Sequence, residues 1–185
     1  MQTEYLNFID AYREEMAETL SELIQIRSVE GEPEETAEKG VMPFGSGVQA
    51  ALDYMLHKAQ EDGFDTENVD NYGGHIEFGG YTLSADGEIT GTSDEVMGIL
   101  GHLDVVPEGS GWDFDPYGGK IEDGKVFGRG AGDDKGPVLA AYYAMKALKN
   151  SGFVPEKKVR LILGLDEETN WKGMTHYFSK VAPPS

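Results

Sequence analysis

Two apolar runs separated by an amphipathic stretch constrain the fold of this chain most strongly. Residues 96–100 and 157–165 each predict a buried strand, and residues 138–150 between them have the apolar periodicity of a helix. Pro137 suits the first turn of that helix, and Gly152 suits its end. This order predicts a parallel strand pair with a right-handed crossover, and we expect residues 96–100 to form a buried central strand.

The N-terminal half predicts two further helices and short strands. Thr3 can cap a helix that runs to about Gln25, followed by a polar loop over residues 29–43. A second amphipathic helix begins at Ser46 and should end at Gly63. Apolar residues at helical spacing give the first helix a face for the core: Leu6, Ile9, Met16, Leu20 and Leu23. Short strands are expected at 73–78 and 81–84, with a turn at Asp86-Gly87.

These elements together predict an α/β fold with a mixed, largely parallel central sheet flanked by helices. We expect residues 1–185 to form a single domain, because this length buries a core of ordinary size and the chain has no convincing linker. There is no cysteine, so no disulfide contributes.

The charge of the chain narrows the classes of partner. The formal net charge is -19, which argues against binding to nucleic acid and to an anionic membrane surface. The N-terminal residues lack a signal-type pattern, and no run approaches the roughly 20 apolar residues of a membrane span. We therefore predict a cytoplasmic protein.

A histidine and an aspartate directly follow the first apolar run. His102 and Asp104 are separated by one residue, which puts both side chains on one side of an extended strand. A neutral imidazole can bind a divalent cation through one nitrogen while a carboxylate fixes the other. The pattern predicts a metal ligand with its orienting partner, although a three-residue motif alone is weak.

Two later segments add carboxylates at the same kind of position. Asp133 and Asp134 lie in a glycine-rich turn before the predicted helix, and Glu167 and Glu168 follow the second apolar run. Ligand sites of open α/β sheets lie at the carboxyl ends of the strands, so these side chains should converge. One histidine with several carboxylates suits a divalent cation with a free carboxylate as base. The pattern leaves open which of the two glutamates plays which part.

The ordered motifs GHLDVVP, GRGAGDDKGP and DEETNWKG resemble the zinc-dependent M20 family of peptidases and deacylases. Within it, the likeness is greatest to bacterial dipeptidases of the PepV type, and IQIRSVEGEP and MPFGSGVQAALDYML extend it over most of the chain. The resemblance implies two zinc ions, with manganese and cobalt as alternatives. It also implies a cis peptide bond between Asp133 and Asp134.

The resemblance implies a role for each of five residues. His102 would bind one zinc ion and Asp104 would orient it. Asp133 would bridge both ions, Glu167 would act as the general base, and Glu168 would bind the other ion. The implied activity is hydrolysis of the amide bond of a small peptide by a water that two metals activate.

The chain departs from the family pattern near its C-terminus. A full member has another acidic ligand, a distant histidine ligand and an inserted lid domain, whereas His176 here lies in a predicted helix. We therefore expect a catalytic domain that is incomplete at its C-terminus. A metal-dependent dipeptidase is the main hypothesis. The alternatives are a related deacylase or desuccinylase, an inactive metal-binding fragment, and a piece whose exposed sheet edge docks the missing remainder.

Other conspicuous side chains have structural interpretations. His57 and His75 lack a carboxylate at ligand spacing, and Arg129 is expected to pair with an acidic neighbour. The aromatic turn at residues 110–119 is more typical of packing than of substrate binding.

Overall fold

A four-stranded mixed sheet forms the centre of the molecule in the computed structural model, which describes residues 4–185. Its order is β3 (Asp65–Asn68), β4 (Gly74–Gly79), β10 (Lys158–Gly164) and β7 (Val96–His102). β10 pairs parallel to β7 and antiparallel to β4, and β3 pairs antiparallel to β4. The mixed α/β fold is as predicted, and the parallel pair is the predicted one.

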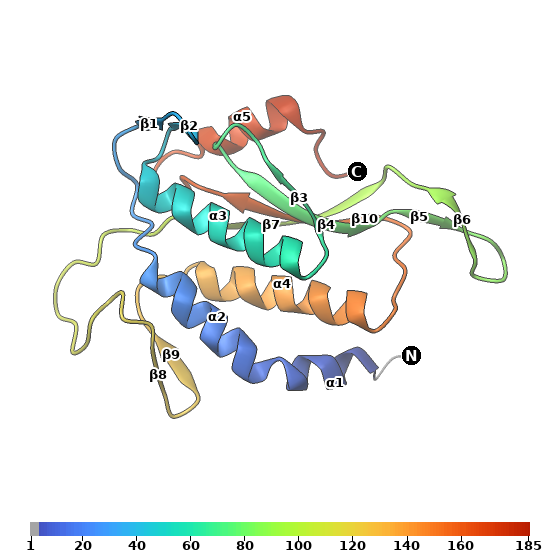
Figure 1. Ribbon diagram of the computed structural model, residues 1–185, viewed down its shortest axis with the longest axis horizontal. Helices are drawn as coiled ribbons and strands as arrows, with labels where there is room; N and C mark the ends of the chain where they lie inside the picture. Colours follow the sequence, from blue (N-terminus) through green and yellow to red (C-terminus); the bar gives the residue numbers. More distant parts are fainter. Residues whose placement is uncertain (1–3) are drawn as a thin grey trace.

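Helices cover both faces of this sheet (Figure 1). α3 (Ser46–Glu61) and α4 (Lys135–Asn150) lie on one face, and α5 (Lys172–Lys180) lies on the other. α1 (Glu4–Ala11) and α2 (Arg13–Gln25) form an outer layer that contacts α4. The predicted helix start at Ser46 is confirmed, and the helix stops just before Gly63, whose φ of 74° suits a residue after a helix end.

The alternation of β10 divides the core into two parts. Leu161 and Leu163 belong to the cluster beneath the sheet that α3 and α4 complete, whereas Ile162 packs against Met174 and Tyr177 of α5. Each fully buried leucine contributes about 1.5–3 kcal/mol relative to an exposed one. β10 is therefore the strand buried on both faces.

The expectation that residues 96–100 form the central strand is wrong. β7 lies at the edge of the sheet formed by residues 4–185, and β10 occupies the interior position. Met97 and Leu100 are 44% and 51% exposed. Apolar composition predicted burial correctly for β10, but the neighbours of β7 within the described chain cover it only in part.

The N-terminal segment differs from its prediction in two places. The expected helix over residues 3–25 is divided at Tyr12 into α1 and α2, and its proposed cap Thr3 lies outside the described residues. The expected loop at 29–43 contains a small hairpin of β1 (Glu34–Thr36) and β2 (Gly40–Met42). The backbone of Lys39 donates to the Thr36 hydroxyl, and Gly40 has a φ of 69°, so the turn is fixed locally in a polar sequence.

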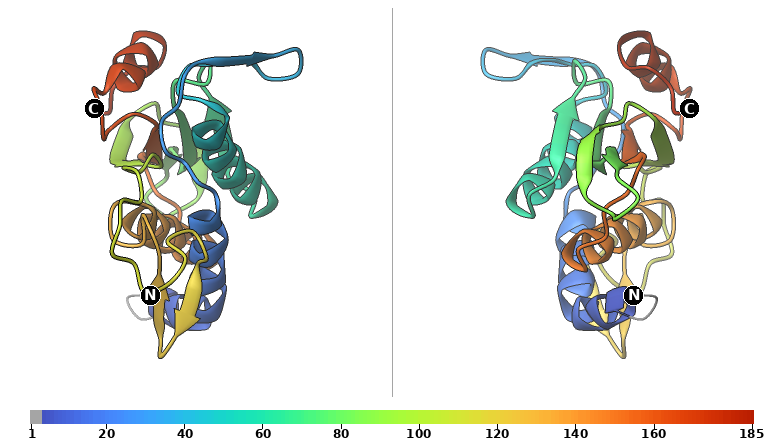
Figure 2. Two further views of the ribbon diagram at one scale, coloured as in Figure 1. Left: turned by 90° about the vertical axis from the view of Figure 1, so that its left-hand side faces the viewer. Right: turned by 90° about the vertical axis from the view of Figure 1, so that its right-hand side faces the viewer.

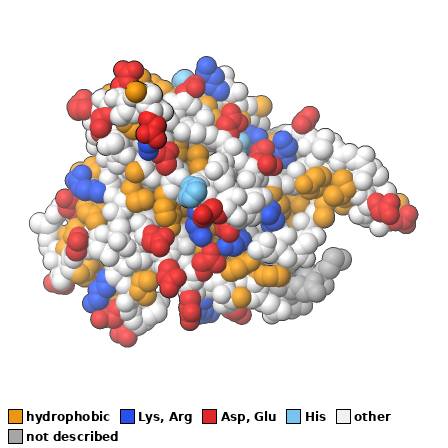
Figure 3. Space-filling view, viewed as in Figure 1, with side chains coloured by type: hydrophobic (Ala, Val, Ile, Leu, Met, Phe, Trp, Pro, Cys, Tyr) orange, Lys and Arg blue, Asp and Glu red, His pale blue; other side chains and the backbone are white. Residues whose placement is uncertain are grey.

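Three hairpins project from the body (Figures 1 and 2). They are β1–β2, the pair β5 (Tyr81–Leu83) and β6 (Ile89–Thr92), and the pair β8 (Lys120–Glu122) and β9 (Lys125–Phe127). The predicted turn at Asp86-Gly87 connects β5 to β6, and Gly87 has a φ of 83°. Acidic side chains are spread over the face drawn in Figure 3, so much of the negative charge is solvated. Among residues 4–185, no helix has the length and apolarity of a membrane-spanning segment.

Candidate metal centre

The four predicted ligand and base residues come from three segments that meet at one end of the sheet. His102 is the last residue of β7 and pairs with Gly164, the last residue of β10. Glu167 and Glu168 follow β10 within four residues, and Asp133 lies just before α4. Because β7 and β10 are parallel, their carboxyl ends share one edge, where ligand sites of such sheets occur.

The side chains of these residues approach one another closely. Ligand atoms of His102, Glu167 and Glu168 all lie within 4.8 Å of one another. His102 Nε2 lies 3.2 Å from Asp133 Oδ1 and 3.9 Å from Glu167 Oε2. The structure thus brings His102, Glu167 and Glu168 together, and within residues 4–185 these three form the one group of at least three potential ligands. Asp133 adjoins this group through its contact with His102.

Asp104 contacts the Nδ1 side of the His102 imidazole ring. His102 Nδ1 lies 3.0 Å from the Asp104 main-chain oxygen and 3.3 Å from its Oδ1. The backbone carbonyl is therefore the nearer partner, whereas the sequence suggested the carboxylate alone. The Asp104 Oδ2 instead accepts the main-chain N–H of Glu168 at 3.0 Å. Asp104 is 1% exposed and thereby ties two ligand-bearing segments together.

The charges of the site favour a bound cation. Burial by itself lowers the pKa of His102, but the hydrogen bond and charge of Asp104 outweigh it and raise the pKa to about 9. Burial and the neighbouring Asp133 raise the pKa of Glu168. Both pKa shifts are those expected where several carboxylates lie close together without a neighbouring cation. A divalent cation bound there would take the place of the proton on His102 Nε2.

The donor set also has the dimensions of a metal site. Ligands that each lie 2.0–2.2 Å from a tetrahedral zinc ion are separated by about 3.4 Å. The 3.2 Å separation of His102 Nε2 and Asp133 Oδ1 matches this spacing. With Nδ1 oriented toward Asp104, Nε2 faces the carboxylates. The residues present therefore fit a divalent cation.

Two residues that the sequence reasoning did not assign also shape the site. The carboxylate of Asp134 accepts the main-chain N–H of His102 at 3.1 Å. The peptide bond between Asp133 and Asp134 is cis, as the resemblance implied. Asp166 is 0% exposed and accepts N–H groups of Lys172 and Gly173 at the start of α5. The residue directly before α5 is Trp171, which makes no side-chain capping bond, so the sequence carried no capping signal that pointed to Asp166.

The other three histidines contact residues outside the candidate metal centre. His57 lies 3.5 Å from Glu61, one helical turn away. His75 is buried and contacts the Tyr177 hydroxyl at 2.9 Å. Burial lowers the pKa of His75 to about 4, which favours its neutral form. His176 lies 2.8 Å from Asp70 and stacks on the Tyr72 ring, and it does not belong to the group of candidate ligands around His102.

The aromatic turn packs as predicted, but Arg129 does not form the expected acidic pair. Its guanidinium lies over the Trp112 ring at 5.3 Å and donates to the main-chain oxygens of Pro107 and Glu108. The backbone turn presents carbonyl groups where the sequence suggested a carboxylate. Trp112 also packs edge-on against Phe114.

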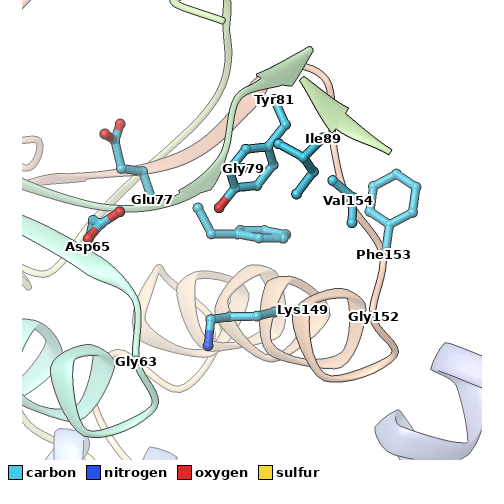
Figure 4. A pocket seen from close by; sticks show the side chains of 11 residues that line it. Gly63, Asp65, Glu77, Gly79, Tyr81, Ile89, Lys149, Gly152, Phe153 and Val154 are labelled. Atoms are coloured by element: carbon cyan, nitrogen blue, oxygen red, sulfur yellow. The ribbon is translucent and has the colours of Figure 1, made fainter. Parts of the chain in front are cut away.

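One surface hollow adjoins the candidate metal centre, and another lies at the opposite end of the sheet. One, of about 180 Å³, adjoins Glu168 and Asp104, and its apolar wall consists of Val29, Val105, Val106 and Pro107. The other, of about 290 Å³, lies between the base of the β5–β6 hairpin and the end of α4, lined by Tyr81, Lys149 and Phe153 among others (Figure 4). Gly79 in its wall pairs with Lys158 at the start of β10, so this hollow is at the opposite end of the sheet from His102.

Comparison with known proteins agrees with this geometry. Residues 98–183 match the model of Peptidase family M20/M25/M40. The chain is 40% identical over 173 residues to the putative dipeptidase YtjP of Bacillus subtilis, covering 94% of this chain and 34% of that protein. It is 41% identical over 185 residues to the Beta-Ala-Xaa dipeptidase of Lactobacillus delbrueckii subsp. lactis, covering 100% of this chain and 36% of that protein. The chain thus spans about a third of the length of these curated relatives.

Solved structures share the fold. The crystal structure of human carnosine dipeptidase 1 superimposes with a TM-score of 0.74 at 24% identity, covering 97% of this chain and 38% of that one. The structure of the di-peptidase Dug1p from Saccharomyces cerevisiae gives a TM-score of 0.73 at 22% identity, covering 96% and 37%. At these identities the likeness supports the fold and adds nothing on the site.

Proposed function

Because this chain belongs to the M20 family of peptidases, we propose that it supplies the metal-binding part of a dipeptidase that hydrolyses the amide bond of small peptides. The observation that carries the proposal is the convergence of His102, Asp133, Glu167 and Glu168 at the carboxyl ends of two parallel strands. The dipeptidase names of its relatives at about 40% identity support the class of substrate.

Each residue has a distinct part in the proposed reaction. His102 would hold one cation through Nε2, and Asp104 fixes the ring by accepting from Nδ1. Asp133 would contribute its carboxylate to both cations, and Glu168 would hold the second. The bound cations would polarise the scissile carbonyl and lower the pKa of water from about 16 toward neutrality.

Glu167 moves the protons in this scheme. Its carboxylate removes a proton from water as the oxygen adds to the carbonyl carbon. It then gives that proton to the leaving nitrogen as the carbon–nitrogen bond breaks, so that one water is consumed for each amide bond. Its Oε2 lies 3.9 Å from His102 Nε2, close enough to act beside the cation that His102 would hold. Glu168 is restrained by Asp104 through its main chain, which favours the ligand role for Glu168 and the mobile base role for Glu167.

Zinc is the proposed ion, and two would occupy the complete site. One imidazole with carboxylates suits zinc, but manganese and cobalt accept the same donors. Isothermal titration calorimetry of the metal-free chain with each of the three ions would rank their affinities.

The edge position of β7 supports an association with a further polypeptide. Met97 and Leu100 are exposed on its two faces, and its outer edge has no strand beside it within residues 4–185. We propose that the remaining part of the family's catalytic domain covers this edge and adds the further ligands. Mixing the chain with a separately produced remainder, taken from the Lactobacillus relative, should give a heterodimer in size-exclusion chromatography, and two separate peaks would contradict it.

The test of the activity is hydrolysis of a dipeptide panel by the chain with added zinc or manganese. N-acyl amino acids are included because a deacylase or desuccinylase would share the proposed ligands. Glu167→Gln should abolish turnover and retain the metal, whereas the exposed Glu35→Gln serves as the matched control. Metal-dependent dipeptide turnover supports the proposal, and turnover of N-acyl substrates alone favours the deacylase. Metal binding without turnover favours the metal-binding fragment, and absence of both rejects the metal centre.

The cytoplasmic location remains a prediction from the sequence. Fractionation of the source cells, with an antibody against this chain, would test it against a periplasmic or secreted location.

A further inference from the structure

We propose that Asp134 is a positioning residue that, together with Gly101, locks the end of β7 to the turn that carries Asp133. In this lock the Asp134 side chain acts as a hydrogen-bond acceptor, so its shape and its oxygen matter more than its charge. The proposal assigns a part to two residues that neither bind the cation nor touch the substrate in the proposed function.

The direction of the His102 N–H follows from that of its neighbour. The N–H of Leu103, which directly follows β7, donates to the main-chain oxygen of Gly164 in β10 at 2.9 Å. Successive amides of a strand point to opposite sides, so the amide of His102 points away from β10. On that side β7 has no neighbouring strand within the described residues, and the His102 N–H instead donates to Asp134 Oδ2 at 3.1 Å. Asp134 therefore takes the place of a strand partner at this position.

Gly101, the residue before His102, leaves room for the Asp134 carboxylate. A Cβ atom at Gly101 would lie 2.7 Å from Asp134 Oδ2 and 2.6 Å from Val138 Cγ2. Both separations are shorter than real Cβ contacts, so any other residue would have to displace the Asp134 carboxylate and the Val138 side chain. The absence of a side chain at position 101 is thus what allows Asp134 to reach the His102 amide.

The lock holds the end of β7 in register with the turn that carries Asp133. Asp134 grips the main chain of His102, and the adjacent Asp133 places Oδ1 at 3.2 Å from the same residue's Nε2. The Asp134 carbonyl also accepts the N–H of Val138, so the residue is anchored in the first turn of α4. The turn before α4 therefore contacts the end of β7 twice, through Asp133 and through Asp134. The distance between the proposed ligands His102 and Asp133 depends on the contact that Asp134 makes.

The test separates the acceptor from the charge. Asp134→Asn keeps an oxygen that can accept the amide, whereas Asp134→Leu has a similar shape without an acceptor. Gly101→Ala perturbs the same contact from the other side. Hydrogen exchange at the His102 amide, followed by NMR in the metal-free chain, reports the contact directly. Zinc affinity, measured by competition with a chelator, reports its consequence for the site.

We expect Asp134→Asn to retain amide protection and zinc affinity within about threefold. Asp134→Leu and Gly101→Ala should lose the protection and weaken zinc binding by about 10–100-fold, as for other groups that orient metal ligands. Loss of both properties in Asp134→Asn would contradict the acceptor role. Unchanged protection in Asp134→Leu would overturn the lock itself.

The readouts also distinguish this proposal from the proposed function, on which only its zinc-affinity consequence rests. If the wild-type chain binds no zinc, the metal centre fails, and exchange at the His102 amide still decides whether the lock exists. If Asp134→Leu does not fold, the Asn variant still decides, because protection that falls in a folded Asn variant rejects the proposal.

Discussion

Replacement of Asp166 by alanine should destabilise the chain through α5. The carboxylate is 0% exposed and accepts the N–H groups of Lys172 at 2.6 Å and Gly173 at 3.0 Å. Hydrogen bonds to a charged group are each worth about 1.5–3 kcal/mol, so two would contribute about 3–6 kcal/mol. Burial, which raises the pKa of Asp166, offsets part of this gain. We therefore expect a net loss of about 2–3 kcal/mol in the free energy of unfolding.

The assay is urea unfolding followed by circular dichroism, with thermal unfolding in parallel. For a chain of this size, a loss of about 2–3 kcal/mol corresponds to a fall in Tm of roughly 4–12 °C. Asp86→Ala is the matched control, because Asp86 lies exposed in the β5–β6 turn and should change stability by less than about 0.5 kcal/mol. A loss below about 0.5 kcal/mol in Asp166→Ala would refute the capping role. Asp166→Asn should lie between the two, because its amide group would oppose one of the two donors.

Two further predictions test the core and the packing of the N-terminal helices. Leu163→Ala should lower the free energy of unfolding in urea by about 2–5 kcal/mol because Leu163 is 0% exposed. Leu100→Ala is the control, since Leu100 is 51% exposed and its loss should be less than about 1 kcal/mol. Equal losses would contradict the assignment of β10 as the interior strand. Burial alone raises the pKa of Glu15, but hydrogen bonds from Lys146 and Lys58 outweigh it and lower the pKa to about 2. Its stabilising contribution is therefore complete above its ordinary pKa of 4.5 and declines as the pH falls toward 2. Because the side chain is 40% exposed, solvent screening reduces the expected contribution to about 1–2 kcal/mol, so Glu15→Gln should be less stable than wild type by that amount at pH 7. The difference should shrink at pH 3, and a difference that grows at low pH would contradict the sign.

The sequence predicted the elements whose burial follows from their own residues. β10 and α4 were found because an apolar run and a helical period each identify a buried element. The parallel pairing of β7 with β10 followed from the helix between them. The convergence of His102 with the acidic segments followed in turn, because parallel strands present their carboxyl ends on one edge.

The remaining features depend on contacts between distant residues. The break at Tyr12 lies inside a continuous helical pattern, and the β1–β2 hairpin has a polar sequence that reads as a loop. The edge position of β7 depends on which strands are available as neighbours, a property that its own apolar residues do not encode. Asp134 and Asp166 were missed as structural groups because their partners are main-chain amides, which every sequence contains.

Zinc binding by the metal-free chain, measured by isothermal titration calorimetry for wild type and His102→Ala, decides whether the proposed metal centre exists. The wild-type chain should bind zinc saturably, and His102→Ala should lose at least about 100-fold in affinity, with urea unfolding confirming that the variant is folded. Equal binding by the two folded chains would mean that zinc is held elsewhere, and would contradict the metal centre at the carboxyl ends of β7 and β10.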